Sequence, residues 1–158
     1  MSHPEYVEAS WARDRVLEEA RPLPAGEVRL EDALGLRLAE GIRAPRDLPP
    51  FPRVMMDGYA VRVSDAGKPV RLLGEVAAGQ ESPEAVETGG CVAVMTGAPC
   101  PRGAEAVVPL ERAAFSELRV LLPAELRRGD HISPRGNDCI RGSVILGPDA
   151  PVTPLALG

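Results

Sequence analysis

Two short loops carry the side chains best suited to chemistry, and the first is the Asp57-Gly58 pair in PFPRVMMDGYAV, residues 50–61. An Asp-Gly pair between apolar residues is typical of a two-residue type I′ hairpin turn, which needs positive φ at both centres. A carboxylate at the entrance of a strand is also well placed to serve a function. Turn chemistry alone favours the hairpin, and the functional alternative stays open.

The second loop is MTGAPCPRGAE, residues 95–105, in which Thr96-Gly97 follows the apolar run CVAV and precedes two prolines. The Thr96 hydroxyl and the nearby backbone N–H groups therefore lie on a stiff loop, and such a loop can bind an oxyanion. A purely structural role is the favoured alternative. The loop is not a P-loop, because the G-x-x-x-x-G-K-[ST] pattern is absent and the single Lys, Lys68, is distant in sequence.

Further polar side chains lie near Pro and Gly residues. Glu105 and Glu111 flank AVVPL; on a strand they would lie about 20 Å apart, too far to act together on one bond. We therefore interpret them as two solvated strand ends. The stretch SPRGNDCIRG, residues 133–142, is either an anion-binding turn or, as its charges favour, a salt-bridged loop; its polar members are Arg135, Asn137, Asp138 and Arg141.

Nucleophilic and zinc chemistry find little support. Neither His3 nor His131 belongs to an H-E-x-x-H or G-x-S-x-G pattern. The cysteines show no C-x-x-C spacing, which argues against a zinc site and a disulfide framework and favours a reducing cytoplasm; they are Cys91, Cys100 and Cys139.

Composition limits the classes of partner. The 158 residues carry a formal net charge of −5, which argues against nucleic acid because phosphates require a basic patch. No apolar run approaches the length of a membrane span, and the N-terminus lacks the apolar core of a signal peptide. With 44% hydrophobic but only 3% aromatic residues, the expected core is aliphatic. We expect a cytoplasmic protein.

The expected elements begin with helices and continue with strands. Helical spacing predicts a helix over residues 4–20 and a second over 29–42, whose latter half is alternatively a strand. The proline-rich segment 44–53 is an extended connector. Short β-type runs then recur about every ten residues, a pattern typical of an all-β unit; they are GYAVRV, VRLLGEV, CVAVMT, EAVVPLE and LRVLL, with SVILG later. The fold class expected is α+β and β-rich.

These pieces, taken in order, resemble the N-terminal half of the molybdopterin molybdenumtransferase family, called MoeA in bacteria and the gephyrin E domain in animals. The segments that carry the resemblance are DLPPFPRVMMDGYAV, GEVAAGQ, CVAVMTGAPCPRGAEAVVPLE and GDHISPRGNDCIRGSVILGPDAPVTPLALG. The spacing of MDGYA and MTGAP is specific, and the resemblance covers nearly the whole chain.

The resemblance implies a bifurcated β-structure with an N-terminal helix and an inserted β-rich subdomain. We expect residues 1–44 and 127–158 to form a discontinuous, dimer-forming α+β subdomain and residues 45–126 the insert. The family inserts molybdenum from molybdate into adenylylated molybdopterin with a divalent cation such as Mg²⁺, and it forms homodimers. The molybdopterin adenylyltransferase is a candidate partner.

The resemblance also implies roles for single residues. Asp57 and Thr96 match residues of the active-site cleft, where Asp57 would orient the metal ion or a water and Thr96 would donate a hydrogen bond to an oxyanion. The residues expected around the bound cofactor are Gly58, Gly97, Glu111 and Asp138.

Three departures from the family pattern matter. Val54 stands where the family usually has Ser, which removes a hydroxyl beside the expected site, and Glu105 stands where Asp is usual and keeps the charge. The larger catalytic domain of the family is absent, so we expect this chain alone to be inactive. The alternative is a short non-catalytic paralogue that acts as a binding or scaffold module.

Overall fold

The computed structural model describes residues 6–80, 85–117 and 119–157 of the chain. It divides into two compact units, Met1–Glu40 with Pro148–Gly158 and Gly41–Gly147. Residues 127–147, which the sequence assigns to the outer subdomain, are here grouped with the β-rich unit. The subdomain boundaries 1–44, 45–126 and 127–158 stay a prediction.

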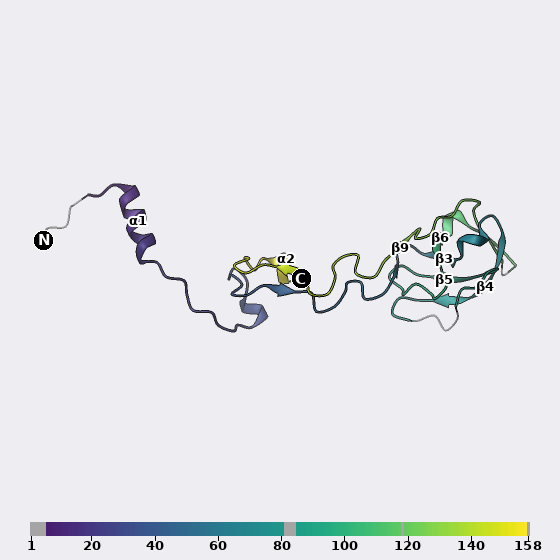
Figure 1. The fold of residues 1–158 in the computed structure, drawn as a ribbon, viewed down its shortest axis with the longest axis horizontal. Coiled ribbons are helices and arrows are strands. Elements are labelled where there is room, and N and C mark those ends of the chain that lie inside the picture. The colour runs from purple at the N-terminus through teal and green to yellow at the C-terminus, as the bar shows by residue number, and fades with distance from the viewer. Residues whose placement is uncertain (1–5, 81–84, 118, 158) are drawn as a thin grey trace. The chain divides into compact units, whose positions relative to one another are not determined.

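The first unit contains α1 (Ala9–Glu19), the 3-10 turn η1 (Leu30–Asp32) and α2 (Pro154–Leu157), seen at the purple and yellow ends of the ribbon in Figure 1. The helix expected over 4–20 is confirmed from Ala9 onward, whereas Pro4 lies outside the described residues. The helix expected over 29–42 is wrong beyond its first turn. Gly35 has a φ of 82°, and Arg37 then pairs with Pro151 in an isolated β-bridge, as the strand alternative suggested.

The second unit is built on a six-stranded sheet in the order β6-β3-β5-β4-β8-β7. All neighbours are antiparallel except β4 and β5, which are parallel. Its strands are β3 (Gly58–Val61), β4 (Pro69–Val76), β5 (Gly90–Val94), β6 (Ala106–Pro109), β7 (Ala114–Ser116) and β8 (Arg119–Leu121).

Smaller elements complete this unit. Two short ribbons pair β1 (Ile42–Arg43) with β10 (Val144–Leu146) and β2 (Arg53–Val54) with β9 (Ile132–Ser133). Two 3-10 turns, η2 (Val63–Asp65) and η3 (Leu110–Arg112), follow β3 and β6. The expected β-type runs are confirmed as strands, although Leu118, at the start of LRVLL, lies outside the described residues. The α+β, β-rich fold class is confirmed.

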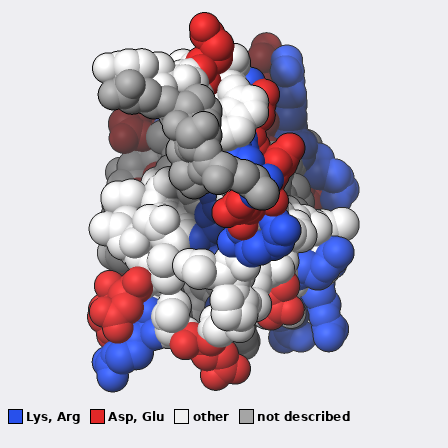
Figure 2. Space-filling view, turned by 90° about the vertical axis from the view of Figure 1, so that its left-hand side faces the viewer, with Lys and Arg blue, Asp and Glu red and all other residues white. Residues whose placement is uncertain are grey.

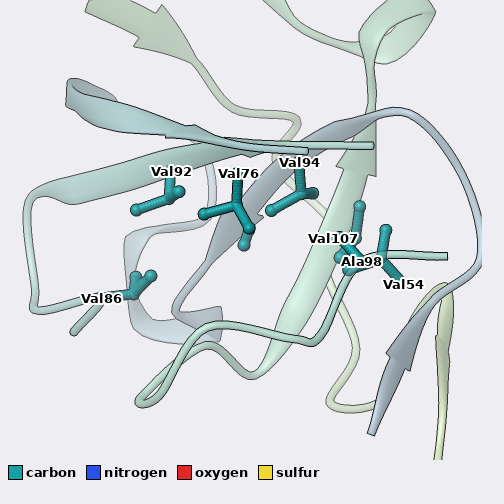
Figure 3. Packing of buried hydrophobic residues seen from close by; sticks show 8 residues of the cluster. Val54, Val76, Val86, Val92, Val94, Ala98 and Val107 are labelled. Atoms are coloured by element: carbon teal, nitrogen blue, oxygen red, sulfur yellow. The ribbon is translucent and has the colours of Figure 1, made fainter. Parts of the chain in front are cut away.

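The core is aliphatic, as the composition predicts, and it consists mainly of valine. Because side chains alternate along a strand, adjacent residues of β3 and β6 enter two different clusters. One cluster, shown in Figure 3, contains Val54, Ala60, Val76, Val86, Val92, Val94, Ala98 and Val107. The other contains Val61, Val70, Cys91, Ala106, Val108, Val120 and Leu122. Burying a valine side chain contributes about 1.5–3 kcal/mol, so these clusters hold the sheet on which the loops rest.

Glu105 is not a solvated strand end, so that part of the interpretation of the Glu105 and Glu111 pair is wrong. Its side chain is only 14% exposed, and its Oε2 accepts a hydrogen bond of 3.0 Å from the Val63 backbone N–H. Arg128 donates to Oε1 at 2.7 Å, and Arg62 lies 3.6 Å away. These contacts lower the pKa of Glu105, first through the Val63 N–H and then through the charges of the two arginines. Glu111, in η3, is exposed.

We predict that Glu105→Gln lowers the urea midpoint of unfolding at pH 7, because the amide loses the charge that both arginines face. The pKa of Glu105 is lower in the folded than in the unfolded chain, so its contribution is complete above the unfolded value of about 4.3. It is lost as pH falls through the folded pKa. The difference between variant and wild type should therefore disappear in acid. An equal difference at pH 7 and at pH 2.5 would contradict this.

Candidate functional site

The structure brings Asp57 and Thr96 into direct contact, as their joint assignment to one cleft requires. The Oδ1 atom of Asp57 accepts two hydrogen bonds of 2.7 Å, one from the backbone N–H of Thr96 and one from its hydroxyl. Both side chains are exposed. Two donors on one oxygen fix the orientation of the carboxylate and leave Oδ2 for a ligand.

The sheet explains why the two residues meet. Gly58 of β3 faces Val94 of β5 in an antiparallel pair, so Asp57 and Thr96 lie just beyond the same end of that pair. The 96–98 loop is fixed beside β2, because Gly97 N–H donates to Val54 at 2.9 Å and Val54 N–H donates to Ala98 at 2.9 Å. Gly97 has a φ of 87°, a conformation that favours glycine.

The Asp57-Gly58 pair does not form the hairpin that turn chemistry favours. β2 pairs with β9, and β3 pairs with β5 and β6, so the pair joins strands that are not neighbours. Gly58 is absent from the glycines of positive φ. It is required for a different reason: a Cβ there would lie 2.1 Å from the Val108 carbonyl oxygen of β6. The hairpin interpretation is wrong, and Gly58 allows the close approach of two backbones.

The two hydrogen bonds also set the charge of Asp57. They lower the pKa of its carboxyl, the Thr96 N–H having the larger effect and the Thr96 hydroxyl the smaller. Asp57 is therefore ionised at neutral pH. A carboxylate only accepts hydrogen bonds, so the Thr96 hydroxyl proton is already engaged in this arrangement. That hydroxyl can orient Asp57, but it cannot donate to an oxyanion at the same time.

Exposed apolar side chains flank this pair. Met56 precedes Asp57, Met95 precedes Thr96, and Met55 lies beside them in the chain, with exposed fractions of 39%, 44% and 56%. Leu110 is 49% exposed, and its N–H donates to the Asp57 carbonyl at 3.2 Å. The sequence shows Met55 and Met56 beside Asp57, whereas the proximity of Leu110 follows only from its hydrogen bond to the Asp57 carbonyl.

Two further expected site residues, Glu111 and Asp138, lie in η3 and in the 133–142 loop. Glu111 and Asp138 make no hydrogen bond or ion pair with Asp57 or Thr96 among the described residues. Asp138 instead contacts the Arg53 guanidinium at 3.5 Å. Their roles at the site stay predictions.

Residues 133–142 form a salt-bridged loop, as expected. Arg135 donates to the Asp47 carboxylate at 2.6 Å, and the Arg141 backbone N–H donates to its other oxygen at 2.8 Å. The Arg141 N–H, followed by the Arg135 hydrogen bond, lowers the pKa of Asp47. Asp47 was missed in the sequence because it lies in the proline-rich connector, 88 residues from Arg135.

Val54 faces away from the candidate site. It is 1% exposed and packs in the cluster of Figure 3. A side chain at this position therefore contributes to the core, and the missing serine hydroxyl leaves no gap beside Asp57. Cys91 and Cys100 are poor nucleophiles, because burial raises the pKa of Cys91 to about 12 and that of Cys100 to about 11.

The described residues offer neither a metal cluster nor a helical membrane span. Within residues 6–80, 85–117 and 119–157, no group of three or more His, Cys, Asp or Glu side chains could hold a metal ion. Over those residues, every helix is too short or too polar to cross a bilayer. Basic and acidic side chains both appear among the residues visible in Figure 2, as a modest net charge implies.

Comparison with known proteins decides the family. The MoeA N-terminal region, domains I and II, matches residues 7–158. The chain belongs to this family. A molybdopterin molybdenumtransferase of Synechocystis sp. is 38% identical over 122 residues, which are 74% of this chain and 31% of the relative. Its counterpart in Bacillus subtilis is 36% identical over 166 residues, 88% of this chain and 39% of the relative.

Solved structures agree with this assignment. A crystal structure of the molybdopterin biosynthesis MoeA protein from Pyrococcus horikoshii OT3 superposes with a TM-score of 0.78 at 32% identity, covering 82% of this chain and 36% of that one. The chain thus spans about a third of the length of the MoeA relatives it matches.

Proposed function

We propose that this chain is the N-terminal part of a cytoplasmic molybdopterin molybdenumtransferase, which inserts molybdenum from molybdate into adenylylated molybdopterin. The single observation that carries the proposal is the exposed Asp57 carboxylate, held by two donors of Thr96 in a chain of the MoeA family. Such an orientation suits positioning and charge stabilisation rather than covalent chemistry.

The Asp57 carboxylate would supply one ligand to the Mg²⁺ that the family resemblance implies, and the other ligands would come from substrate and water, since the described residues hold no cluster of metal ligands. Mg²⁺ is usually bound by one or two carboxylates together with substrate phosphates and water, and the Oδ2 atom of Asp57 accepts no hydrogen bond from the described residues. Bound there, the ion would neutralise negative charge on phosphate or molybdate oxygens. Thr96 holds the Asp57 carboxylate in one orientation and lowers its pKa further.

The function is tested in a chimera in which this chain replaces the matching residues of the Synechocystis sp. relative. Molybdenum insertion into adenylylated molybdopterin is measured for the chimera and for the 158-residue chain alone. We expect activity in the chimera and none in the chain alone. An inactive chimera that folds and dimerises would contradict the proposal and favour a non-catalytic scaffold module.

We also propose that the chain forms a homodimer and that α1 contributes to the contact. No residue of α1 is buried within its own compact unit. Its apolar side chains are largely exposed, with Trp11 at 57%, Val16 at 68% and Leu17 at 64%. Isolated helices of this length are marginal in water, so burial of these three apolar side chains against a second copy would stabilise α1.

Trp11→Glu is expected to shift the chain from dimer to monomer in size-exclusion chromatography with light scattering, because it places a charge in the apolar contact. The matched control is Arg13→Glu on the same helix, which is expected to leave the dimer in place. A dimer that survives Trp11→Glu and Leu17→Glu together would exclude α1 from the contact.

A further inference from the structure

A three-stranded ribbon of backbone connects the candidate site to Arg53. On one side of β2, Cys100 N–H donates to Pro52 at 2.8 Å, and Arg53 and Pro99 form a β-bridge. On the other side, β9 pairs Arg53 with Ser133. The segment that begins at Thr96 therefore continues directly past Arg53.

Arg53 and Ser133 share one face of this ribbon. Side chains alternate along a strand and directly paired residues point to the same side. Val54 and Ile132, the next pair along, pack in or against the core cluster of Figure 3. Arg53 and Ser133 therefore lie on the opposite face, away from that cluster.

The guanidinium of Arg53 is only loosely held. Asp138 is its single side-chain partner among the described residues, at 3.5 Å, the upper limit for a hydrogen bond. The side chains of Arg53 and Asp138 are 41% and 51% exposed. A guanidinium has five N–H donors, so the described side chains leave most of the Arg53 donors unused.

Ser133 supplies the second, independent observation. It is 4% exposed, and its Oγ has no hydrogen-bond partner in the part of the chain that the structure describes. A buried hydroxyl without a partner is unfavourable and requires an explanation, such as a ligand or ion at the site. Its cross-strand neighbour is the cation Arg53.

We propose that Arg53 and Ser133 form a binding subsite for a tetrahedral oxyanion. Two N–H groups of Arg53 bind two oxygens of the anion, in the geometry that guanidinium groups prefer, and the Ser133 hydroxyl, which is covered in the free chain, donates to a third once Arg53 turns from Asp138 toward the anion. Asp138 pairs with the Arg53 guanidinium when the anion is absent and turns to solvent when the anion binds. The choice of anion rests on the proposed function, since molybdate and the phosphate of adenylylated molybdopterin share this chemistry.

The subsite is tested by NMR titration of the 158-residue chain with sodium molybdate, inorganic phosphate and AMP at constant ionic strength. Saturable shifts are expected at the Arg53 Nε–H and the Ser133 backbone N–H. Arg53→Gln should weaken binding about tenfold, and Asp138→Asn should strengthen it because a competing carboxylate is removed. The matched control is Arg71→Gln, which removes an equal charge from the start of β4 and should leave affinity within about twofold.

The outcomes separate the sources of the anion. Saturation by molybdate alone assigns the subsite to molybdate, and saturation by phosphate and AMP alone assigns it to the nucleotide. Thermal unfolding of each variant checks the fold. Arg53→Lys keeps the positive charge but loses the two parallel N–H donors of the guanidinium, so it should bind with intermediate affinity. Absence of saturation by every anion, or equal weakening by Arg53→Gln and Arg71→Gln, overturns the subsite. Because binding is read without turnover, an inactive chimera would contradict the proposed function and leave the subsite standing.

Discussion

Asp57→Asn is expected to lower the rate of molybdenum insertion by the Synechocystis chimera about a hundredfold or more, with no loss of fold. The amide keeps the size of the side chain and can still accept from Thr96, whose two donors lie 2.7 Å from Oδ1. It loses the negative charge that would orient a metal ion or water. The rate is measured under saturating molybdate and compared with the unmodified chimera.

Variants of Thr96 show how much of the rate depends on the orientation of Asp57 rather than on its charge. Thr96→Val removes the hydroxyl donor but keeps the backbone N–H, so a partial loss of rate, about tenfold, is expected. Thr96→Ser keeps both donors and should retain activity. A chimera with Asp57→Asn that worked at the rate of the unmodified chimera would remove Asp57 from the mechanism.

The pKa of Asp57 gives a readout that does not depend on turnover. Both Thr96 donors favour the ionised carboxylate and lower its pKa, so Thr96→Val should raise that pKa toward its ordinary value of about 3.9. The ¹³C chemical shift of the Asp57 side-chain carboxyl carbon, followed during an acid titration, measures this change in pKa directly.

The strands could be predicted from sequence because their signal is local. Valine-rich runs such as those at residues 91–94 and 105–108 contain buried side chains. Their strand pattern can be recognised without knowing which strands they pair with. Residues 29–42 show the opposite case. Their apolar spacing predicts a helix, yet Leu36 and Leu38 make backbone hydrogen bonds with Val152 and Ala150, more than a hundred residues away. Long-range pairing overrode the local pattern, and no window of sequence contains that information.

The candidate site was also predictable from sequence only in part. Asp57 and Thr96 were assigned together by the resemblance, and the structure places them in contact. The hairpin interpretation of Asp57-Gly58 failed because it assumed that the strands on either side pair with each other. What fixes the turn is the approach of β6 to Gly58, and only the sheet order β6-β3-β5 reveals it.

Gly58→Ala is therefore expected to destabilise the chain by about 3 kcal/mol or more. The added Cβ would lie 2.1 Å from the Val108 carbonyl oxygen and 2.8 Å from its carbonyl carbon. Both are backbone atoms of β6, so no rotamer change can relieve the contact, and the pairs Gly58 with Pro109 and Tyr59 with Val108 must separate. Urea unfolding at neutral pH measures the loss.

Gly74→Ala is the matched control, because Gly74 is also a strand glycine of the six-stranded sheet, without positive φ. A Cβ there meets nothing within 4 Å. Since glycine lowers strand stability through its unfolded-state freedom, this variant should be neutral or more stable by up to about 1 kcal/mol. Equal stability of Gly58→Ala and Gly74→Ala would show that β6 can move away at little cost. The position of Asp57 would then depend on Thr96 alone rather than on the packing of β3 against β6.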